Sequence, residues 1–312
     1  MTAQERASLL RANVRIPSGD ESLAAWLYRP AAPNPPVVVM AHGLGGVKEM
    51  RLDAYADRFV AAGYAVVVFD YRYFGASSGR PRQLLDIDTQ LADWRNVLTW
   101  VRSQPGLDSR RIVLWGTSFG GGLVIQVAAE DHDIAAVIAQ CPFTDGSASA
   151  RAGSAVSAAK VAGLAILDLA AARLGRGPVM VASSGAPGQA ALMSGPDSLS
   201  GYLALADDAP TFRNHVAARF GLAITRFQPG RQTHRITAPV FFALCDTDSV
   251  APAAVTRQHA ARAHRGEVHH YPCGHFDIYL GRPFEQVVAD YLDFLDRHVP
   301  ISPATDGRTR DE

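Results

Sequence analysis

A serine between two glycines, Gly116-x-Ser118-x-Gly120, offers the most specific chemistry in this 312-residue chain. An apolar, strand-like run precedes it in RIVLWGTSFGGG, and a helical run follows it. A sharp turn from strand into helix strains the serine backbone, so the residues two positions away must be small. The pattern predicts Ser118 as an exposed nucleophile and the Phe119 amide, at the helix N-terminus, as one oxyanion donor. An ordinary glycine turn remains the alternative.

A serine hydroxyl becomes a nucleophile when a base takes its proton and a carboxylate orients that base. We expect His275 to be the base, because YPCGHFDIY places it in a loop after a strand-like run, at the same sheet edge as Ser118. Asp248, in FFALCDTDSVAP, is the expected carboxylate because it falls in the loop beyond the next-to-last strand. Asp246 lies two residues earlier and remains an alternative.

The second oxyanion donor is expected in the loop of VVVMAHGLGG. The backbone N–H of Leu44 is the candidate, since the glycines around it let the loop approach a substrate oxygen closely. We expect His42 to hold this loop through hydrogen bonds. A glycine turn without substrate contact is the alternative.

The elements that must position these residues alternate along the chain. Two β-like pieces at residues 12–16 and 22–28 predict an antiparallel hairpin. Short runs that are apolar on both faces then alternate with helical stretches, which is typical of parallel strands covered by helices on each side. The sequence therefore predicts a doubly wound α/β sheet. Helices are expected over residues 52–62, 88–103, 119–129, 158–174 and 283–298.

Residues 144–235 break this rhythm, being rich in alanine, glycine and serine with one helical stretch and loop-like passages. We interpret them as a cap inserted into a core made of residues 1–143 and 236–300, with residues 301–312 as a flexible tail. A disordered linker is the alternative. Apolar side chains that could pack on the core favour the cap: Tyr202, Leu203, Leu205, Phe212, Phe220, Leu222 and Phe227.

With HGLGG, FDYRYFGASSG, GTSFGG, CDTDSVAP and GHFDIY in this order, the chain resembles the α/β-hydrolase superfamily. It is most similar there to the group of bacterial dienelactone hydrolases and the catalytic domain of X-prolyl dipeptidyl peptidases. The resemblance implies an α/β-hydrolase fold with a mostly parallel eight-stranded sheet, a cap, and the roles given above to Ser118, Asp248, His275, Leu44 and Phe119. The family often has glycine where this chain has Tyr73 and Cys245, so both side chains are candidates for shaping the pocket, together with His42.

Composition limits the partners. The formal net charge is zero, so neither nucleic acid nor a membrane is expected, and a small molecule is. The N-terminus lacks the pattern of a secretory signal, no uninterrupted apolar span of membrane length follows, and three cysteines suit a reducing compartment, so a cytoplasmic location is expected. No metal site or cofactor is expected, because the histidines and cysteines lack close ligand spacing and serine acyl transfer needs none. A homodimer is left open.

These observations favour a serine hydrolase that cleaves a carboxylic ester or thioester of a fairly apolar small molecule. The same fold also supports carbon–carbon bond formation or cleavage, lactone closure or acyl transfer, because fold does not determine function. A scaffold that binds a ligand without turnover is the third hypothesis, and the complete set of expected catalytic residues argues against it.

Overall fold

A central sheet of eight strands forms the core of the computed structural model, which describes residues 11–301. The strand order is β1-β2-β4-β3-β5-β6-β10-β11. Strands β1 and β2 are antiparallel to each other, β2 is antiparallel to β4, and the remaining neighbours are parallel. The predicted hairpin and mostly parallel sheet are thereby confirmed. The strands are β1 Arg11–Ser18, β2 Glu21–Tyr28, β3 Val37–Ala41, β4 Ala65–Phe69, β5 Ile112–Thr117, β6 Ala136–Gln140, β10 Val240–Cys245 and β11 Gly266–Tyr271.

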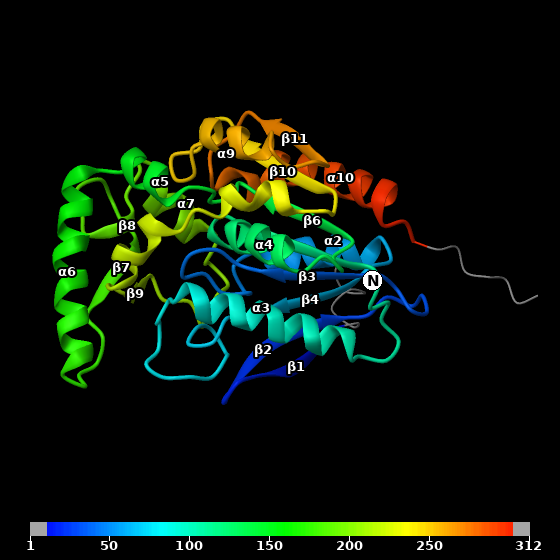
Figure 1. Ribbon diagram of the computed structural model, residues 1–312, viewed down its shortest axis with the longest axis horizontal. Coiled ribbons are helices and arrows are strands. Elements are labelled where there is room, and N and C mark those ends of the chain that lie inside the picture. Colours follow the sequence, from blue (N-terminus) through cyan, green and yellow to red (C-terminus); the bar gives the residue numbers. More distant parts are fainter. Residues whose placement is uncertain (1–10, 302–312) are drawn as a thin grey trace, which may run out of the picture.

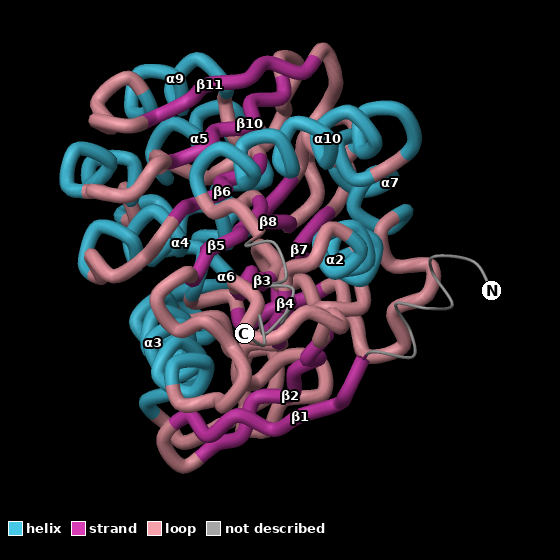
Figure 2. The backbone as a smooth tube through the Cα atoms, turned by 90° about the vertical axis from the view of Figure 1, so that its right-hand side faces the viewer, coloured by secondary structure: helices cyan, strands magenta, loops and turns pink. Residues whose placement is uncertain are grey.

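Helices cover both faces of this sheet. Figure 2 shows α3 (Ile87–Arg102), α4 (Phe119–Glu130) and α9 (Ala253–Ala260) on one face, and α2 (Leu52–Ala61) and α10 (Gly281–His298) on the other. The inner strands β3, β4, β5 and β6 are buried along their whole length, as strands covered on both faces must be. The four helices predicted outside residues 144–235 are all present, with ends that differ from the predicted ones by at most two residues.

Helix α3 illustrates why the sequence folds in this way. Asp86 caps its N-terminus by accepting a hydrogen bond from the Thr89 amide at 2.9 Å. Leu91, Trp94 and Leu98 recur at helical spacing and are buried on the side that faces the sheet. Sequence periodicity therefore determines both the helix and its orientation.

We call residues 144–235 the insert. Most of the insert forms a separate layer at one end of the molecule (Figure 1), whereas residues 229–235 pack against α4 and α9. The insert contains a second sheet of three short strands in the order β8-β7-β9. Helix α6 lies on the outer side of this sheet. The sequence predicted a single helix and loops here. The difference arises because the strands are three to five residues long and rich in alanine and serine, so they lack the apolar run that signals a strand. The elements are α5 Gly146–Ala152, α6 Ala155–Arg173, β7 Met180–Ser184, β8 Ala191–Met193, α7 Ser198–Ala204, β9 His215–Ala217, α8 Phe220–Ala223, η1 Ile224–Arg226 and η2 Pro229–Arg235.

Aromatic side chains join the insert to the core. The Phe119 ring, beside the predicted nucleophile, lies 5.5 Å from Phe143, 5.4 Å from Phe220 and 5.5 Å from Phe227 between ring centroids. Such edge-to-face and tilted pairs add to the stabilisation from burial. One expected packing residue differs, since Leu203 is 41% exposed. Where the core and cap divide stays a prediction, and the predicted tail lies outside the described residues except for Ile301.

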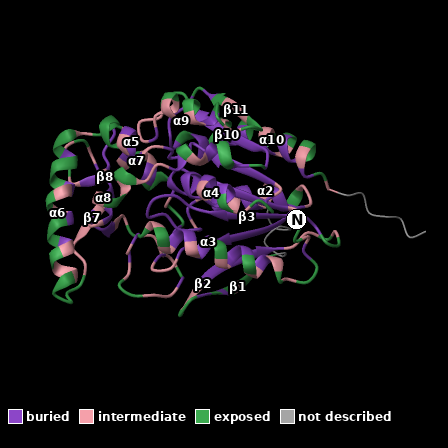
Figure 3. Cartoon of the chain, viewed as in Figure 1, coloured by how far each residue is buried: buried purple, intermediate pink, exposed green. Residues whose placement is uncertain are grey.

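Burial differs sharply between the two layers. In Figure 3 the central strands are buried throughout, whereas α6 is mostly exposed or half-buried. Among helices within residues 11–301, α6 is the one long and apolar enough to cross a membrane by length and composition. Lys160 and Asp168 interrupt the apolar sequence of this helix.

Candidate active site

The turn at Ser118 connects β5 to α4. Its backbone has a φ of 55° and a ψ of −122°, a conformation that L-residues rarely adopt. A Cβ added at Gly116 would lie 2.3 Å from the carbonyl oxygen of Gly120, and one added at Gly120 would lie 2.5 Å from that of His42. Both distances are shorter than any real Cβ contact, so this turn requires glycine at both positions. The glycine pattern read from the sequence has this steric origin.

Three side chains from separate loops meet at this turn. His275 Nε2 lies 2.9 Å from Ser118 Oγ, and His275 Nδ1 lies 2.7 Å from Asp248 Oδ2. The other carboxylate oxygen of Asp248 accepts hydrogen bonds from the backbone amides of Val250 at 2.8 Å and Ala251 at 2.6 Å. The His275 and Asp248 side chains are each 1% exposed. The structure thus brings together the three residues that the sequence predicts as nucleophile, base and carboxylate.

The alternative carboxylate lies elsewhere. Asp246 Oδ1 is 2.8 Å from His270 Nδ1, and both side chains are 44% exposed. Asp246 directly follows β10. Asp248 lies two residues further along the loop, where its carboxylate contacts His275. Of the two aspartates, Asp248 alone contacts the predicted base.

The loop after β3 lies against the Ser118 turn. A Cβ added at Gly43 would lie 3.0 Å from Ser118 Cβ and 3.3 Å from the Phe119 amide nitrogen. Leu44, Ser118 and Phe119 line one cavity together. The first amides of a helix have no acceptor within the helix, and the helix dipole favours negative charge there. The expected oxyanion donors, Leu44 and Phe119, therefore border the same space as the serine hydroxyl.

His42 supports this loop from beneath. It is 3% exposed, its Nδ1 accepts a hydrogen bond from the Gly43 amide at 2.8 Å, and its ring stacks on Tyr279. Burial lowers the pKa of His42 to about 4, so its ring is neutral at physiological pH. A Cβ added at Gly46 would lie 2.1 Å from His42 Nδ1, which explains the last glycine of HGLGG.

A cavity of about 230 Å³ opens above Ser118, between the core and the insert. Its walls carry apolar side chains from both parts, together with serine and threonine hydroxyls. A space of this kind suits a mainly apolar ligand that is oriented by a few polar groups. The larger apolar residues are Leu44, Phe119, Phe143, Val161, Leu192, Met193, Leu222, Ile224 and Val250, and the hydroxyl groups besides that of Ser118 belong to Ser149, Ser154, Ser157, Ser194, Thr225 and Ser249.

Two of the expected pocket residues do not line this cavity. The Tyr73 ring lies against Gly79, because the chain turns back there and the Tyr73 amide donates to the Ser78 carbonyl at 2.9 Å. Cys245, at the end of β10, is 1% exposed, and its Sγ lies within 4.8 Å of a carboxylate oxygen of Asp248. Neither side chain lines this cavity, and a pocket role for Tyr73 and Cys245 stays a prediction. The third residue, His42, borders a small space beside Ser118 and His275.

The three cysteines are buried and free of disulfides. The sequence showed no close ligand spacing, but the fold brings the possible ligand atoms of Cys141, Cys245 and Asp248 within 4.8 Å of one another. Asp248 already accepts three hydrogen bonds, from His275 and from two backbone amides. Two members of this cluster, Asp248 and Cys141, are also charge neighbours of His275.

Burial by itself would lower the pKa of His275. The neighbouring groups Asp248 and Cys141 outweigh this effect and raise the pKa of His275 well above 6.5. A buried thiol would ordinarily have a raised pKa. For Cys141, the hydrogen bond with Cys245 and the charge of His275 reverse this and lower the pKa to about 6. Thiol and imidazole therefore stabilise each other's charged form.

We expect Cys141→Ala to move the acid limb of the kcat/KM profile to lower pH. A base must be neutral, so activity falls as pH drops through the pKa of His275. Removing the thiol removes one group that raises that pKa, and activity then persists at lower pH. The measurement is the pH profile of kcat/KM on an aryl ester. Cys273→Ala is the matched control and should leave the acid limb in place; equal shifts in both variants would contradict the assignment.

Sequence reasoning assigned Tyr202 to packing and missed its polar contact. Its hydroxyl, on α7 of the insert, donates a hydrogen bond of 2.6 Å to the Leu44 carbonyl across 158 positions. Burial raises the pKa of Tyr202, so the hydroxyl stays protonated and can donate. Nearby, Ser249 Oγ donates to Asp197 Oδ1 at 2.5 Å, and Thr211 Oγ1 donates to Glu49 Oε2 at 2.6 Å. The insert is thus joined to the loop that carries Leu44 and to the loop that carries Asp248.

We expect Tyr202→Phe to lower kcat by about fivefold to tenfold with little change in KM, because a displaced oxyanion donor acts mainly in the transition state. Loss of this bond also leaves the buried Leu44 carbonyl unsatisfied, at about 1–2 kcal/mol of unfolding free energy. Steady-state kinetics and thermal unfolding measure the two effects. Tyr64→Phe is the matched control, since the buried Tyr64 hydroxyl donates to the Val299 carbonyl at 3.0 Å, away from Ser118. It should lower stability alone, and a loss of kcat in both variants would contradict a role in positioning.

Comparison with known proteins places the chain in a family. The family model described as "Serine aminopeptidase, S33" matches residues 32–279. The chain belongs to the S33 family of α/β hydrolases. The resemblance seen in the sequence is confirmed, and this S33 chain is an enzyme of hydrolase fold and esterase-like type.

Three relatives of this S33 hydrolase differ in name and in coverage. Quorum-quenching protein AidA of Acinetobacter baumannii is 53% identical over 93% of this chain and 95% of its own length. Thiohydrolase aneE of Aspergillus aculeatus is 39% identical over 36% of this chain and 35% of its own. Polyketide transferase grgF of a Penicillium species is 33% identical over 45% of this chain and 47% of its own. The crystal structure of GrgF superposes with a TM-score of 0.79 at 24% identity, covering 92% of this chain and 98% of GrgF, and it supports the fold.

Proposed function

We propose that this enzyme hydrolyses a carboxylic ester or thioester of a fairly apolar small molecule through an acyl-enzyme on Ser118. The observation that carries the proposal is the continuous line of short contacts from Ser118 Oγ to His275 and on to Asp248, which opens into a largely apolar cavity. A serine, a base and a buried carboxylate in this order form the arrangement that activates a hydroxyl for acyl transfer.

The proposed reaction has two halves. Ser118 Oγ bonds to the acyl carbon while its proton passes to His275 Nε2, and the amides of Leu44 and Phe119 stabilise the negative charge on the carbonyl oxygen. The bond to the leaving alcohol or thiol breaks, and His275 returns the proton to it. Water then attacks the acyl-enzyme with the same help and releases the acid. Asp248 keeps Nδ1–H of His275 directed toward itself, so Nε2 is free to accept a proton.

The names of the relatives agree with ester-type chemistry. One relative is named a thiohydrolase and another a quorum-quenching protein. A signal molecule that contains an ester or a lactone would fit the proposed reaction and the apolar cavity. We therefore include lactones with aryl esters and thioesters in the substrate panel.

Polyketide transferase grgF favours a second function, acyl transfer to an acceptor other than water. The first half of the reaction is then unchanged, and an acceptor nucleophile takes the place of water in the second half. The insert decides between the two, because its side chains determine which molecules reach the acyl-enzyme.

A fluorophosphonate tests the nucleophile. Its phosphorus should bond to Ser118 Oγ with loss of fluoride, which gives one adduct in the intact mass that maps to the peptide containing Ser118. Turnover in ¹⁸O-water then separates the two functions, since hydrolysis places ¹⁸O in the released acid and transfer to another acceptor does not. An adduct elsewhere, or no adduct on folded protein, would refute the proposed nucleophile.

A further inference from the structure

Helix α6, at the outer end of the insert, carries an apolar surface that no other element within residues 11–301 covers (Figure 1). Five large hydrophobic side chains are strongly exposed among residues 11–301, and four of them belong to α6 or its C-cap: Val156 at 57%, Ile166 at 61%, Leu167 at 58% and Leu174 at 69%. Single exposed apolar residues are ordinary, but their concentration on one element indicates an interaction surface.

Helical spacing places these residues on one face. We call this the outer α6 face and define it by Val156, Ala159, Lys160, Gly163, Ile166, Leu167, Ala170 and Leu174. The opposite stripe, Ser157, Val161, Ala165 and Asp168, is buried against the protein. Because residues three and four positions apart lie on the same side of a helix, the two sets occupy opposite sides of α6.

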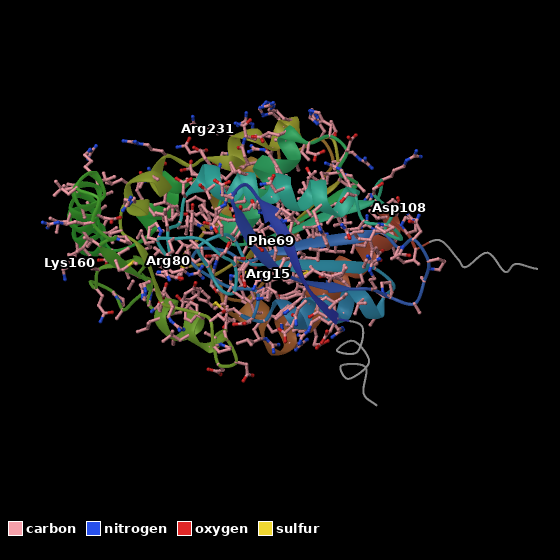
Figure 4. All side chains as sticks on the ribbon, turned by 90° about the horizontal axis from the view of Figure 1, so that it is seen from below. Arg15, Phe69, Arg80, Asp108, Lys160 and Arg231 are labelled. Atoms are coloured by element: carbon pink, nitrogen blue, oxygen red, sulfur yellow. The ribbon has the colours of Figure 1, made fainter. Side chains whose placement is uncertain are left out.

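Positive charge is concentrated in the sequence within and next to α6. Between Asp145 and Asp197 the sequence contains one carboxylate, Asp168, whose side chain is fully buried and pairs with Arg219 at 2.7 Å. Four cationic residues of the same segment are exposed: Arg151, Lys160, Arg173 and Arg176. Figure 4 shows Lys160 at the outer end of the molecule.

The whole insert shares this bias. Residues 144–235 contain nine lysine and arginine residues and five aspartates, a formal net charge of +4 in a chain whose total is zero. The remaining residues therefore carry −4. A zero net charge thus conceals a basic insert and an acidic core, and the basic end is the one that exposes the apolar helix.

We propose that the outer α6 face docks on an anionic lipid bilayer, with the helix lying parallel to the membrane plane. Apolar side chains beside exposed lysine and arginine are typical of helices that lie in the membrane interface, where cations meet lipid phosphates. This partner departs from the sequence expectation of no membrane, which rested on the charge of the whole chain.

Two other roles for α6, a membrane-spanning helix and a contact between two copies of the chain, fit the observed contacts less well. A spanning helix would have to leave the protein, but Asp168 fastens α6 through Arg219 and through the Val179 amide at 2.8 Å. A second copy would bring a helix that has four exposed cations within and next to it, and no exposed carboxylate between Asp145 and Asp197, against its duplicate, so like charges would meet. Anionic lipid supplies the missing counter-charge.

Docking in this orientation also places the cavity near lipid. Ser157, Ala158, Val161 and Ala162 of α6 line the cavity above Ser118. One helix, about 10 Å across, then separates the cavity from the membrane. Docking requires no turnover, so it can be tested independently of the proposed reaction.

Co-sedimentation with vesicles tests the proposal on the full chain. We expect binding to phosphatidylcholine vesicles that contain phosphatidylglycerol to exceed binding to phosphatidylcholine alone by at least about tenfold, and to fall as salt is raised. Ile166→Glu/Leu167→Glu should lower binding to the anionic vesicles by at least about tenfold. Leu203→Glu is the matched control, because Leu203 is exposed on α7, outside the outer α6 face, and its binding should equal that of the wild type.

A second variant keeps the test decisive if the first one unfolds. Arg173→Glu/Arg176→Glu changes two exposed side chains, and it should reduce both anionic binding and its salt dependence while thermal unfolding stays unchanged. Equal vesicle binding by this variant and the wild type, or no binding by folded wild type, would overturn the proposal. So would a wild-type dimer in light scattering that Ile166→Glu/Leu167→Glu converts to a monomer while neither protein binds vesicles, since the outer α6 face would then join two copies.

Discussion

Asp248→Asn is expected to lower kcat by about 10⁴-fold while the fold is retained. The asparagine oxygen can still accept the backbone amides of Val250 and Ala251, so the loop keeps its shape. Its amide nitrogen, a donor, then faces His275 Nδ1 in place of a carboxylate oxygen. Nδ1 must become the acceptor and Nε2 the donor, and the ring can no longer take the proton of Ser118.

The matched variant is Asp246→Asn, which changes the same functional group two positions away. Asp246 pairs with His270 at a site where both side chains are 44% exposed, and exposed pairs contribute little. We expect its kcat to stay within about threefold of the wild type. Steady-state kinetics on an aryl ester measure both variants, and Ser118→Ala, measured alongside, gives the residual rate without a nucleophile. Comparable losses at Asp246 and Asp248, or none at Asp248, would contradict the assignment.

Gly116→Ala should lower the unfolding free energy by about 3 kcal/mol and kcat by about 10²-fold. The added Cβ would lie 2.3 Å from the Gly120 carbonyl oxygen and 2.9 Å from Val124 Cγ1, so the first turn of α4 must move away from β5. Because Ser118 and Phe119 stand at this junction, that movement displaces both the nucleophile and one oxyanion donor. Denaturant unfolding and steady-state kinetics measure the two effects.

Gly163→Ala is the matched control, because it makes the same substitution at a glycine that has no close contacts. No atom lies within 4 Å of a Cβ added at this exposed position of α6. Alanine in a helix is more favourable than glycine, so we expect a gain of about 0.5–1 kcal/mol in unfolding free energy and no change in kcat. If Gly116→Ala were as stable and active as the wild type, the close contacts at the Ser118 turn would not be what requires glycine.

Much of the site could be predicted because its constraints are local. Gly116 and Gly120 are required by contacts within the turn that holds Ser118, and the strand before and helix after it show their own periodicities. Residues that follow parallel strands collect at one edge of the sheet, which is why His275 and the loop of Leu44 could be assigned to the same place as Ser118. The choice of Asp248 over Asp246 depended only on how far each lies beyond the end of β10.

The tertiary structure alone decided the features that depend on packing between distant segments. Tyr202 reaches Leu44 across 158 positions, and the Tyr73 ring packs against Gly79 because the loop around it folds back. Strands β7, β8 and β9 are too short and too rich in small residues to produce a pattern.

Helix α6 shows the physical limit most clearly. Its sequence, AVSAAKVAGLAILDLAAAR, is apolar or small on nearly every side, so periodicity predicts a helix but not which face is buried. The buried face is determined by the Asp168–Arg219 ion pair and by Val161, which forms part of the cavity wall. Ile166 and Leu167 lie on the opposite side of the helix and are therefore exposed. The sequence by itself therefore determined the fold class and the predicted nucleophile, base and carboxylate, whereas the shape of the cavity and the exposed face of the insert follow from long-range packing.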